Sequence, residues 1–122
     1  LPSDQPLAAY TYAVFAYNGD MMGKGRISNK VVVGNPMEAP YSQDFSTAQK
    51  FDICEAVNVN ADANTWIREG KYAKYVYNFS NKADDWLLTP PVKLKGGQDY
   101  TFSITAKKGI EKYREKIMLG YG

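Results

Sequence analysis

The stretch Asp84–Leu94, Asp-Asp-Trp-Leu-Leu-Thr-Pro-Pro-Val-Lys-Leu, constrains the fold of this chain more than any other. It begins as a short apolar strand and is interrupted by Pro90 and Pro91, which donate no backbone hydrogen bond. Two such residues fit the end or edge of a sheet and not its centre. A strand of this kind needs partners. We expect residues 92–94, or the neighbouring strand, to pair antiparallel with the alternating segment 100–107, through the glycine turn at residues 96–97.

The composition is that of one ordinary globular domain, and it excludes several kinds of function. The chain has 122 residues, of which 44% are apolar and 23% charged. The net charge of +2 is too small to indicate a nucleic-acid or membrane partner, and no apolar run is long enough to span a bilayer. There is no histidine, and Cys54 is the sole cysteine. Histidine-based triads, histidine-ligated metals and internal disulfides are therefore excluded.

The first third of the chain predicts a hairpin. Residues 10–17 alternate as a strand does, Asn18-Gly19-Asp20 is a turn signal, and residues 28–33 end in three valines. We expect the two strands to pair antiparallel. The proline-bounded segment 36–40 then predicts a linker.

The rest of the chain predicts short strands and almost no helix. One helical turn is expected at residues 47–51, and the whole chain should form about seven strands in an all-β fold. The strand patterns after the linker are residues 41–45, residues 66–68 resumed in 72–77, residues 86–89 resumed in 92–94, residues 100–107 and residues 115–121, whereas residues 53–59 could be a strand or a loop. The residues that we expect in the core are Val14, Val32, Trp66, Trp86, Phe102 and Ile104.

Residues 1–35 resemble the last two strands of a fibronectin type III domain. The resemblance rests on Leu7, Tyr10-Thr11-Tyr12-Ala13-Val14, Ala16-Tyr17-Asn18-Gly19 and Ser28-Asn29 before the valine run. It implies a fibronectin type III-like C-terminal hairpin, without the five strands that would precede it in that family.

Residues 36–122 resemble the first part of the cleaved-adhesin, or choice-of-anchor J, domains of secreted Bacteroidetes proteins, which are similar to MAM domains. The matching segments are Pro40–Phe45, Asp85–Leu94, Gly97–Ser103 and Glu115–Gly122. The resemblance implies an antiparallel, jelly-roll-like β-sandwich, here incomplete. It also implies an extracellular or cell-surface location. With no initiator methionine, the chain is expected to be a fragment of a larger secreted or surface protein.

Four aromatic residues are candidates for ligand binding: Trp66, Tyr72, Tyr75 and Tyr77. Aromatic faces stack on the apolar faces of sugars, which favours a carbohydrate platform. The commoner role of such residues in a strand-rich chain is to fill or flank the core. Tyr75 and Tyr77 share one strand face, which suits either role.

Asp44, Asp84 and Asp85 are the candidate metal ligands, with calcium as the metal. Hard cations take carboxylate, amide and carbonyl oxygens, and structural calcium is what the adhesin resemblance implies. The alternative is that these aspartates are solvated turn residues. Asp84 and Asp85 are adjacent and should point to opposite faces, so they make a poor acid and base pair for glycoside cleavage.

The sequence thus predicts a non-catalytic extracellular adhesion or carbohydrate-binding module, with a glycan or a protein surface as ligand. The alternatives are a purely structural spacer and an accessory domain of a secreted peptidase or glycoside hydrolase. An enzyme would have to use carboxylates alone, and no well-spaced pair stands out. Neither unit is complete, so both should have open sheet edges. Either the hairpin of residues 10–33 docks onto the second unit within one chain, or two chains pair their edges as a homodimer; the short, stiff linker at residues 36–40 favours the homodimer.

Overall fold

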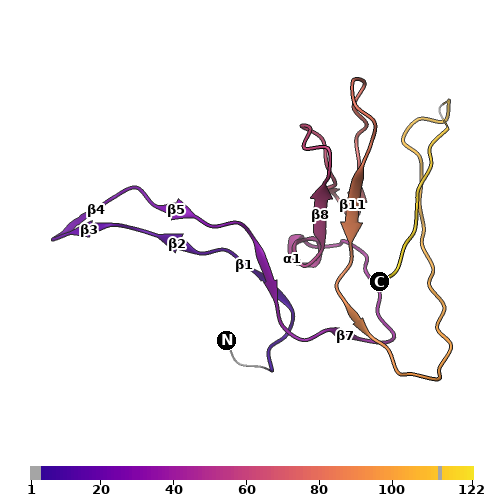
Figure 1. Ribbon diagram of the computed structural model, residues 1–122, viewed down its shortest axis with the longest axis horizontal. Helices are drawn as coiled ribbons and strands as arrows, with labels where there is room; N and C mark the ends of the chain where they lie inside the picture. The colour runs from indigo at the N-terminus through magenta and orange to yellow at the C-terminus, as the bar shows by residue number, and fades with distance from the viewer. Residues whose placement is uncertain (1–3, 113) are drawn as a thin grey trace.

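The computed structural model describes residues 4–112 and 114–122, and these are mostly β. They form small two-stranded sheets and one short helix (Figure 1). The expected ranges that include residues 1–3 and 113 lie partly outside this description. The elements are β1 (Ala8–Tyr10), β2 (Ala13–Val14), β3 (Tyr17–Asn18), β4 (Met21–Met22), β5 (Arg26–Ile27), β6 (Val31–Val33), β7 (Met37–Glu38), α1 (Ala48–Asp52), β8 (Glu55–Asn58), β9 (Ile67–Glu69), β10 (Tyr72–Lys74), β11 (Asp85–Leu88) and β12 (Val92–Lys93).

The predicted hairpin is confirmed and is long. β1 pairs with β6, β2 with β5 and β3 with β4, all antiparallel, and the register shifts by one residue between successive ladders. Its turn lies at Gly19 and Asp20, between the paired residues Asn18 and Met21. Gly19 has a φ of 60°, which a glycine adopts without steric cost at the first central position of a hairpin turn.

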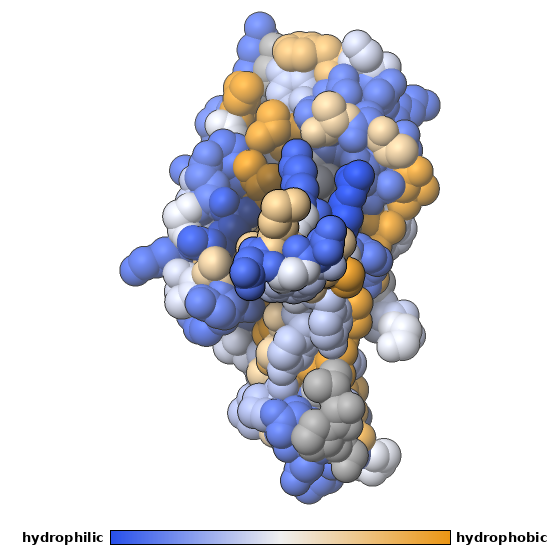
Figure 2. All heavy atoms as spheres, turned by 90° about the vertical axis from the view of Figure 1, so that its left-hand side faces the viewer, coloured by the Kyte–Doolittle hydropathy of each residue, from blue (hydrophilic) through white to orange (hydrophobic). Residues whose placement is uncertain are grey.

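The hairpin extends away from the rest of the molecule, and its side chains are mostly exposed (Figure 1). Val14 is 71% exposed and Ile27 is 76% exposed. The prediction that Val14 lies in the core is therefore wrong, because no other element covers the outer hairpin. Val32, closer to the base, is half-buried. Figure 2 faces the hairpin end and shows separate apolar groups between hydrophilic ones.

The base of the hairpin is attached to α1. β1 lies beside this helix, and the Lys30 ammonium donates to the Cys54 carbonyl over 2.9 Å. Gly34, with a φ of 139°, closes the base where the chain passes Leu7. A Cβ atom on Gly34 would lie 2.5 Å from the Leu7 Cα, so only glycine fits there.

The predicted linker contains a strand. β7 pairs in parallel with β12, with Met37 opposite Val92 and Glu38 opposite Lys93. The Met37 amide extends this ladder by donating to the Pro91 carbonyl over 2.8 Å. The expected antiparallel partner of residues 92–94 was segment 100–107, and that prediction is wrong. The strand that follows the two prolines, β12, pairs with β7 of the linker instead.

Two further ladders form the centre of the molecule. β8 pairs antiparallel with β11, placing Val57 opposite Trp86, and β9 pairs with β10 around a turn at Gly70. The predicted helical turn is confirmed as α1, capped by the Thr47 hydroxyl, which accepts from the Lys50 amide over 3.2 Å.

Residues 41–45 do not form the predicted strand. The Gln43 side chain donates to the Lys50 carbonyl, and its amide oxygen accepts from the Phe45 N–H. Phe45 has a φ of 51°, which is outside the β region. Local side-chain bonds therefore turn this segment where its alternating pattern predicted extension.

The C-terminal segment is extended but unpaired. Among the described residues of 94–122, none belongs to a strand, so the predicted strands 100–107 and 115–121 are wrong (Figure 1). Phe102 is 71% exposed and Ile104 is 50% exposed, so neither is in the core. Alternation of polarity alone does not make a strand, because the backbone also needs a partner ladder.

The buried interior is small. Among the described residues, Cys54 and Pro90 alone are buried, Trp66 is half-buried and Trp86 is 39% exposed. The Trp66 prediction thus holds in part, and Trp86 is less covered than expected. The fold is mostly antiparallel β, as predicted, but the structure shows no sandwich or jelly roll. No helix in the described part of the chain is long and apolar enough to cross a membrane.

Candidate functional site

Trp66 and Tyr75, two of the four predicted aromatic residues, pack against each other. Their ring centroids are 5.7 Å apart, and both side chains are half-buried. The Trp66 indole N–H donates to the Asp85 carbonyl over 3.2 Å. This pair therefore anchors the loop after β8 to β11, and a role for it in sugar binding stays a prediction.

Tyr72 lies apart from that pair, on the exposed face of the β9–β10 hairpin. Its hydroxyl donates to the Glu69 carboxylate over 2.7 Å, and the Lys74 ammonium approaches the same carboxylate at 2.8 Å. The hydrogen bond to Glu69 raises the pKa of Tyr72, and Lys74 lowers the pKa of Glu69. Tyr72 is thus engaged in a surface polar cluster.

Tyr77 forms an exposed aromatic pair with Phe79, a residue that was not among the predicted candidates. The ring centroids are 4.7 Å apart in an edge-to-face arrangement, and Phe79 is 91% exposed. An exposed phenylalanine in a polar loop, Asn78-Phe79-Ser80, is the sequence signal that could have identified it.

The loop beneath this pair is held by Asp62. Its Oδ1 accepts from the Asn64 backbone N–H over 2.7 Å, and its Oδ2 accepts from the side-chain amides of Asn78, Asn60 and Asn81 at 3.0, 3.3 and 3.3 Å. These bonds, the Asn64 one foremost, lower the pKa of Asp62. One carboxylate therefore ties the 58–64 loop to the 76–81 loop.

Several buried oxygen atoms lie on the segments around Asp85. Both Asp85 carboxylate oxygens, the Tyr75 hydroxyl, the Thr65 hydroxyl and the Asn58 Oδ1 are buried without a hydrogen bond of ordinary geometry, although the Tyr75 hydroxyl lies close enough to the Asp85 carboxylate for their interaction to shift the pKa of Tyr75. Asp85 and Asn58 face each other across the β8–β11 ladder. Burial raises the pKa of Tyr75, and the adjacent Asp85 carboxylate raises it further. Uncompensated buried oxygens are costly, so this cluster favours a cation or ordered water.

The three predicted calcium ligands are not brought together. Asp44 pairs with Lys50 at 2.8 Å, which holds the pKa of Asp44 well below its ordinary value. Asp84 is exposed, and its carbonyl accepts from the Val59 amide. Within the described residues, no group of three or more His, Cys, Asp or Glu side chains could hold a metal ion. Of the three predicted ligands, only Asp85 has free buried oxygens, so a cation there would rely on neutral oxygen ligands for the rest of its coordination.

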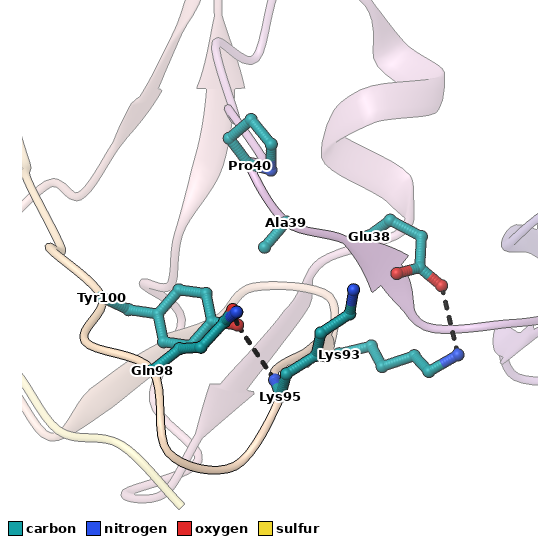
Figure 3. A pocket seen from close by; sticks show the side chains of 7 residues that line it. All are labelled: Glu38, Ala39, Pro40, Lys93, Lys95, Gln98 and Tyr100. Atoms are coloured by element: carbon teal, nitrogen blue, oxygen red, sulfur yellow. Dashed lines mark hydrogen bonds and ion pairs between the residues drawn. The ribbon is translucent and has the colours of Figure 1, made fainter.

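A shallow pocket of about 300 Å³ lies between β7 and the turn that follows β12 (Figure 3). It is separate from the aromatic candidates, and none of its residues was predicted as a site residue. Its lining consists of Glu38, Ala39, Pro40, Lys93, Lys95, Gln98 and Tyr100. Sequence reasoning missed it because the parallel β7–β12 pair, which brings its two sides together, joins residues far apart in the chain.

No family model matches the chain, and neither the curated proteins nor the solved structures contain a match to it.

Proposed function

We propose that this chain is a non-catalytic adhesion or carbohydrate-binding module of a larger secreted or surface protein. The observation that carries this proposal is the exposed Tyr77–Phe79 pair on a loop held by Asp62. In the longer protein, we propose that residues 36–122 contribute to an antiparallel β-sandwich, as the adhesin resemblance implies.

An aromatic pair of this kind is suited to contact a ligand. Apolar side chains that are fixed in place lose little conformational entropy on binding, so more of the contact energy appears as affinity. The edge-to-face geometry holds the two rings relative to each other, and the Asp62 bonds hold the loop beneath them. Aromatic faces beside amide-bearing side chains can contact both the C–H face and the hydroxyls of a sugar.

The absence of histidine and the state of the carboxylates support a non-catalytic role. Asp44 and Glu69 are paired with lysines, and Asp62 accepts several N–H groups. A glycosidase needs two carboxylates that flank one bond, one of them protonated as an acid. Asp44, Asp62 and Glu69 are therefore already engaged in ion pairs or loop bonds, whereas the buried Asp85 carboxylate is not.

Calcium is the cofactor that fits part of this framework. Asp85, Asn58 and Thr65 would hold it through the buried oxygens described above. When bound, the ion would neutralise the buried carboxylate and fix β8 against β11 close to the aromatic loop. One carboxylate among neutral ligands predicts weak binding.

A glycan array probed with the purified chain tests the proposal. We expect binding to a restricted set of glycans, which is lost in Phe79→Ala and Tyr77→Ala. Tyr121→Ala is the matched control, because Tyr121 is fully exposed but lies outside the loop. A blank array would favour the structural spacer. Hydrolysis of a glycan by the chain, lost in Asp85→Asn, would favour an enzyme and contradict the proposal.

The spacer is the second candidate, and a specific observation favours it. The long exposed hairpin resembles a connector more than a ligand platform, since it has one attachment at its base. An accessory domain of a peptidase or glycoside hydrolase is compatible with either role. Glycan binding that persists after Phe79→Ala and Tyr77→Ala would show that the ligand site does not include the aromatic pair.

A further inference from the structure

Hydrogen bonds fix one side of the pocket between β7 and the turn after β12. The Tyr100 hydroxyl accepts from the Lys95 backbone N–H over 2.9 Å and donates to the Gln98 Oε1 over 3.0 Å. These two bonds lock the 95–100 turn and hold the Tyr100 ring on one wall (Figure 3). Tyr100 is 43% exposed, so part of its ring is open to a ligand.

Two polar groups left free in this pocket, on Lys95 and Gln98, are hydrogen-bond donors, while the Glu38 carboxylate is paired with Lys93. The Lys93 ammonium lies 3.4 Å from the Glu38 carboxylate and is thereby partly neutralised. The Lys95 side chain rises towards the Glu38–Pro40 segment (Figure 3), and its ammonium has no ion-pair partner among the described residues. Because the Gln98 oxygen accepts from Tyr100, the Gln98 amino group is left to donate.

An apolar wall with donors beside it defines the kind of ligand. The wall consists of Ala39, Pro40 and the Tyr100 ring; the Gln98 amide lies against Tyr100, and the Lys95 side chain rises beside it (Figure 3). A volume of about 300 Å³ is at the low end for ligand pockets and suits one sugar ring. We propose that this pocket binds the carboxylate-bearing sugar of an acidic glycan, with Lys95 as the charge partner.

The net charge of the pocket favours a single carboxylate over a phosphate. Lys93 and Glu38 offset each other, which leaves the one positive charge of Lys95. A dianionic phosphate would place its second charge near the Glu38 carboxylate, where like charges repel. The inference takes from the proposed function only that the module binds glycans, and it concerns a different surface from the Tyr77–Phe79 pair.

Titration with free glucuronate, followed by NMR chemical shifts of the pocket residues, tests this inference. We expect saturable shifts at Lys95, Gln98 and Tyr100 with glucuronate and none with glucose at equal concentration. Lys95→Gln should weaken glucuronate binding about tenfold, the usual scale for a charge-assisted hydrogen bond. Lys71→Gln, which changes an exposed lysine at the β9–β10 turn, should leave binding unchanged.

A second variant keeps the test decisive. Glu38→Gln removes the repelling carboxylate and frees Lys93, so it should tighten glucuronate binding. Equal shifts with glucose and glucuronate, no saturation, or unchanged binding in Lys95→Gln would each overturn the inference. Phe79→Ala separates the two proposals, because it should abolish array binding through the aromatic pair while glucuronate shifts at the pocket persist.

Discussion

The hairpin from β1 to β6 and the region from α1 to β11 are built in opposite ways. The hairpin has three short backbone ladders in succession and hardly any covered side chains. The α1–β11 region has ladders of four and three residue pairs, its loops are connected by side-chain bonds to the backbone, and it contains the buried Cys54.

This difference separates two ways of fixing a chain: backbone hydrogen bonds between strands, and side-chain hydrogen bonds to loops. A good turn and β-branched strands are enough to set a hairpin's register, but an isolated two-stranded ladder is only marginally stable in water. The α1–β11 region uses polar side chains to fix loops that a larger core would otherwise hold. We therefore expect the α1–β11 region to hold most of the stability, with the hairpin stabilised through its base.

The largest effect should follow from Gly34→Ala, which disrupts the closed base of the hairpin, the part that joins it to the other region. The new Cβ would lie 2.5 Å from the Leu7 Cα and 2.6 Å from the Pro6 carbonyl oxygen. Because these are backbone atoms, the chain has to shift, and we expect a loss of about 3 kcal/mol in the free energy of unfolding. Urea unfolding measures this loss.

Gly109→Ala is the control for that prediction. Nothing lies within 4 Å of a Cβ built at Gly109, so the change should stay within about 0.5 kcal/mol. Equal effects of the two substitutions would show that the closed base of the hairpin contributes nothing. Both tryptophans lie in the α1–β11 region, so their fluorescence also shows whether that region survives when the hairpin detaches.

Trp86→Ala should have the next largest effect, and it acts within the α1–β11 region. Trp86 faces Val57 across the ladder, but it is 39% exposed. Because Trp86 is only partly buried, we expect Trp86→Ala to lower the free energy of unfolding by about 2 kcal/mol, less than the loss for a tryptophan in a core. Phe79→Ala, at a residue 91% exposed, should cost nearly nothing. A Trp86→Ala loss above about 4 kcal/mol would contradict the exposure seen here.

Local signals in the sequence predicted the elements that depend on neighbours in the chain. Asn18-Gly19 predicted the hairpin turn, and Thr47 with its following residues predicted the helical turn. Both depend on backbone geometry within a few residues. The strand at Trp86 was also predicted, because its apolar run and the two prolines define its bounds.

The elements that depend on distant partners could not be predicted in this way. The alternation at Phe102 and Ile104 describes a strand face but not the ladder that would have to pair with it. The candidate site shows the same limit. Asp85 was selected by its charge, whereas the oxygens of Tyr75 and Thr65 around it converge only in the folded chain.

Calcium tests whether the buried oxygens stabilise the α1–β11 region. At a calcium concentration ten times the dissociation constant, the ion should add about 1.4 kcal/mol to stability. Thermal melting with calcium or with a chelator measures this increment. Asp85→Asn should remove it, and Asp44→Asn should retain it, because Asp44 is paired with Lys50. Loss of the increment in Asp44→Asn alone would place the ion elsewhere.

Acid should weaken the α1–β11 region more than the hairpin. Lys50 lowers the pKa of Asp44, the Asn64 N–H lowers the pKa of Asp62, and Lys74 lowers the pKa of Glu69. A lowered pKa in the folded state stabilises the fold above the unfolded-state value of about 4, and this stabilisation is lost as the pH falls further. The melting temperature measured by tryptophan fluorescence should therefore decrease once the pH is below about 4. Asp62→Asn should flatten that dependence, and an unchanged profile would contradict it.

The smallest effect should come from association of two chains through the hairpin. The hairpin exits into β7, which is paired with β12, so it cannot easily fold back over the α1–β11 region. Its open edges and exposed Val14 and Ile27 are then left for a second chain. Light scattering should show a dimer only at high protein concentration, because pairing through the hairpin would bury few side chains and would stabilise the dimer weakly. Ile27→Lys should shift that equilibrium to monomer, and Phe79→Lys should not. A strictly monomeric chain at every concentration would rule out pairing between chains.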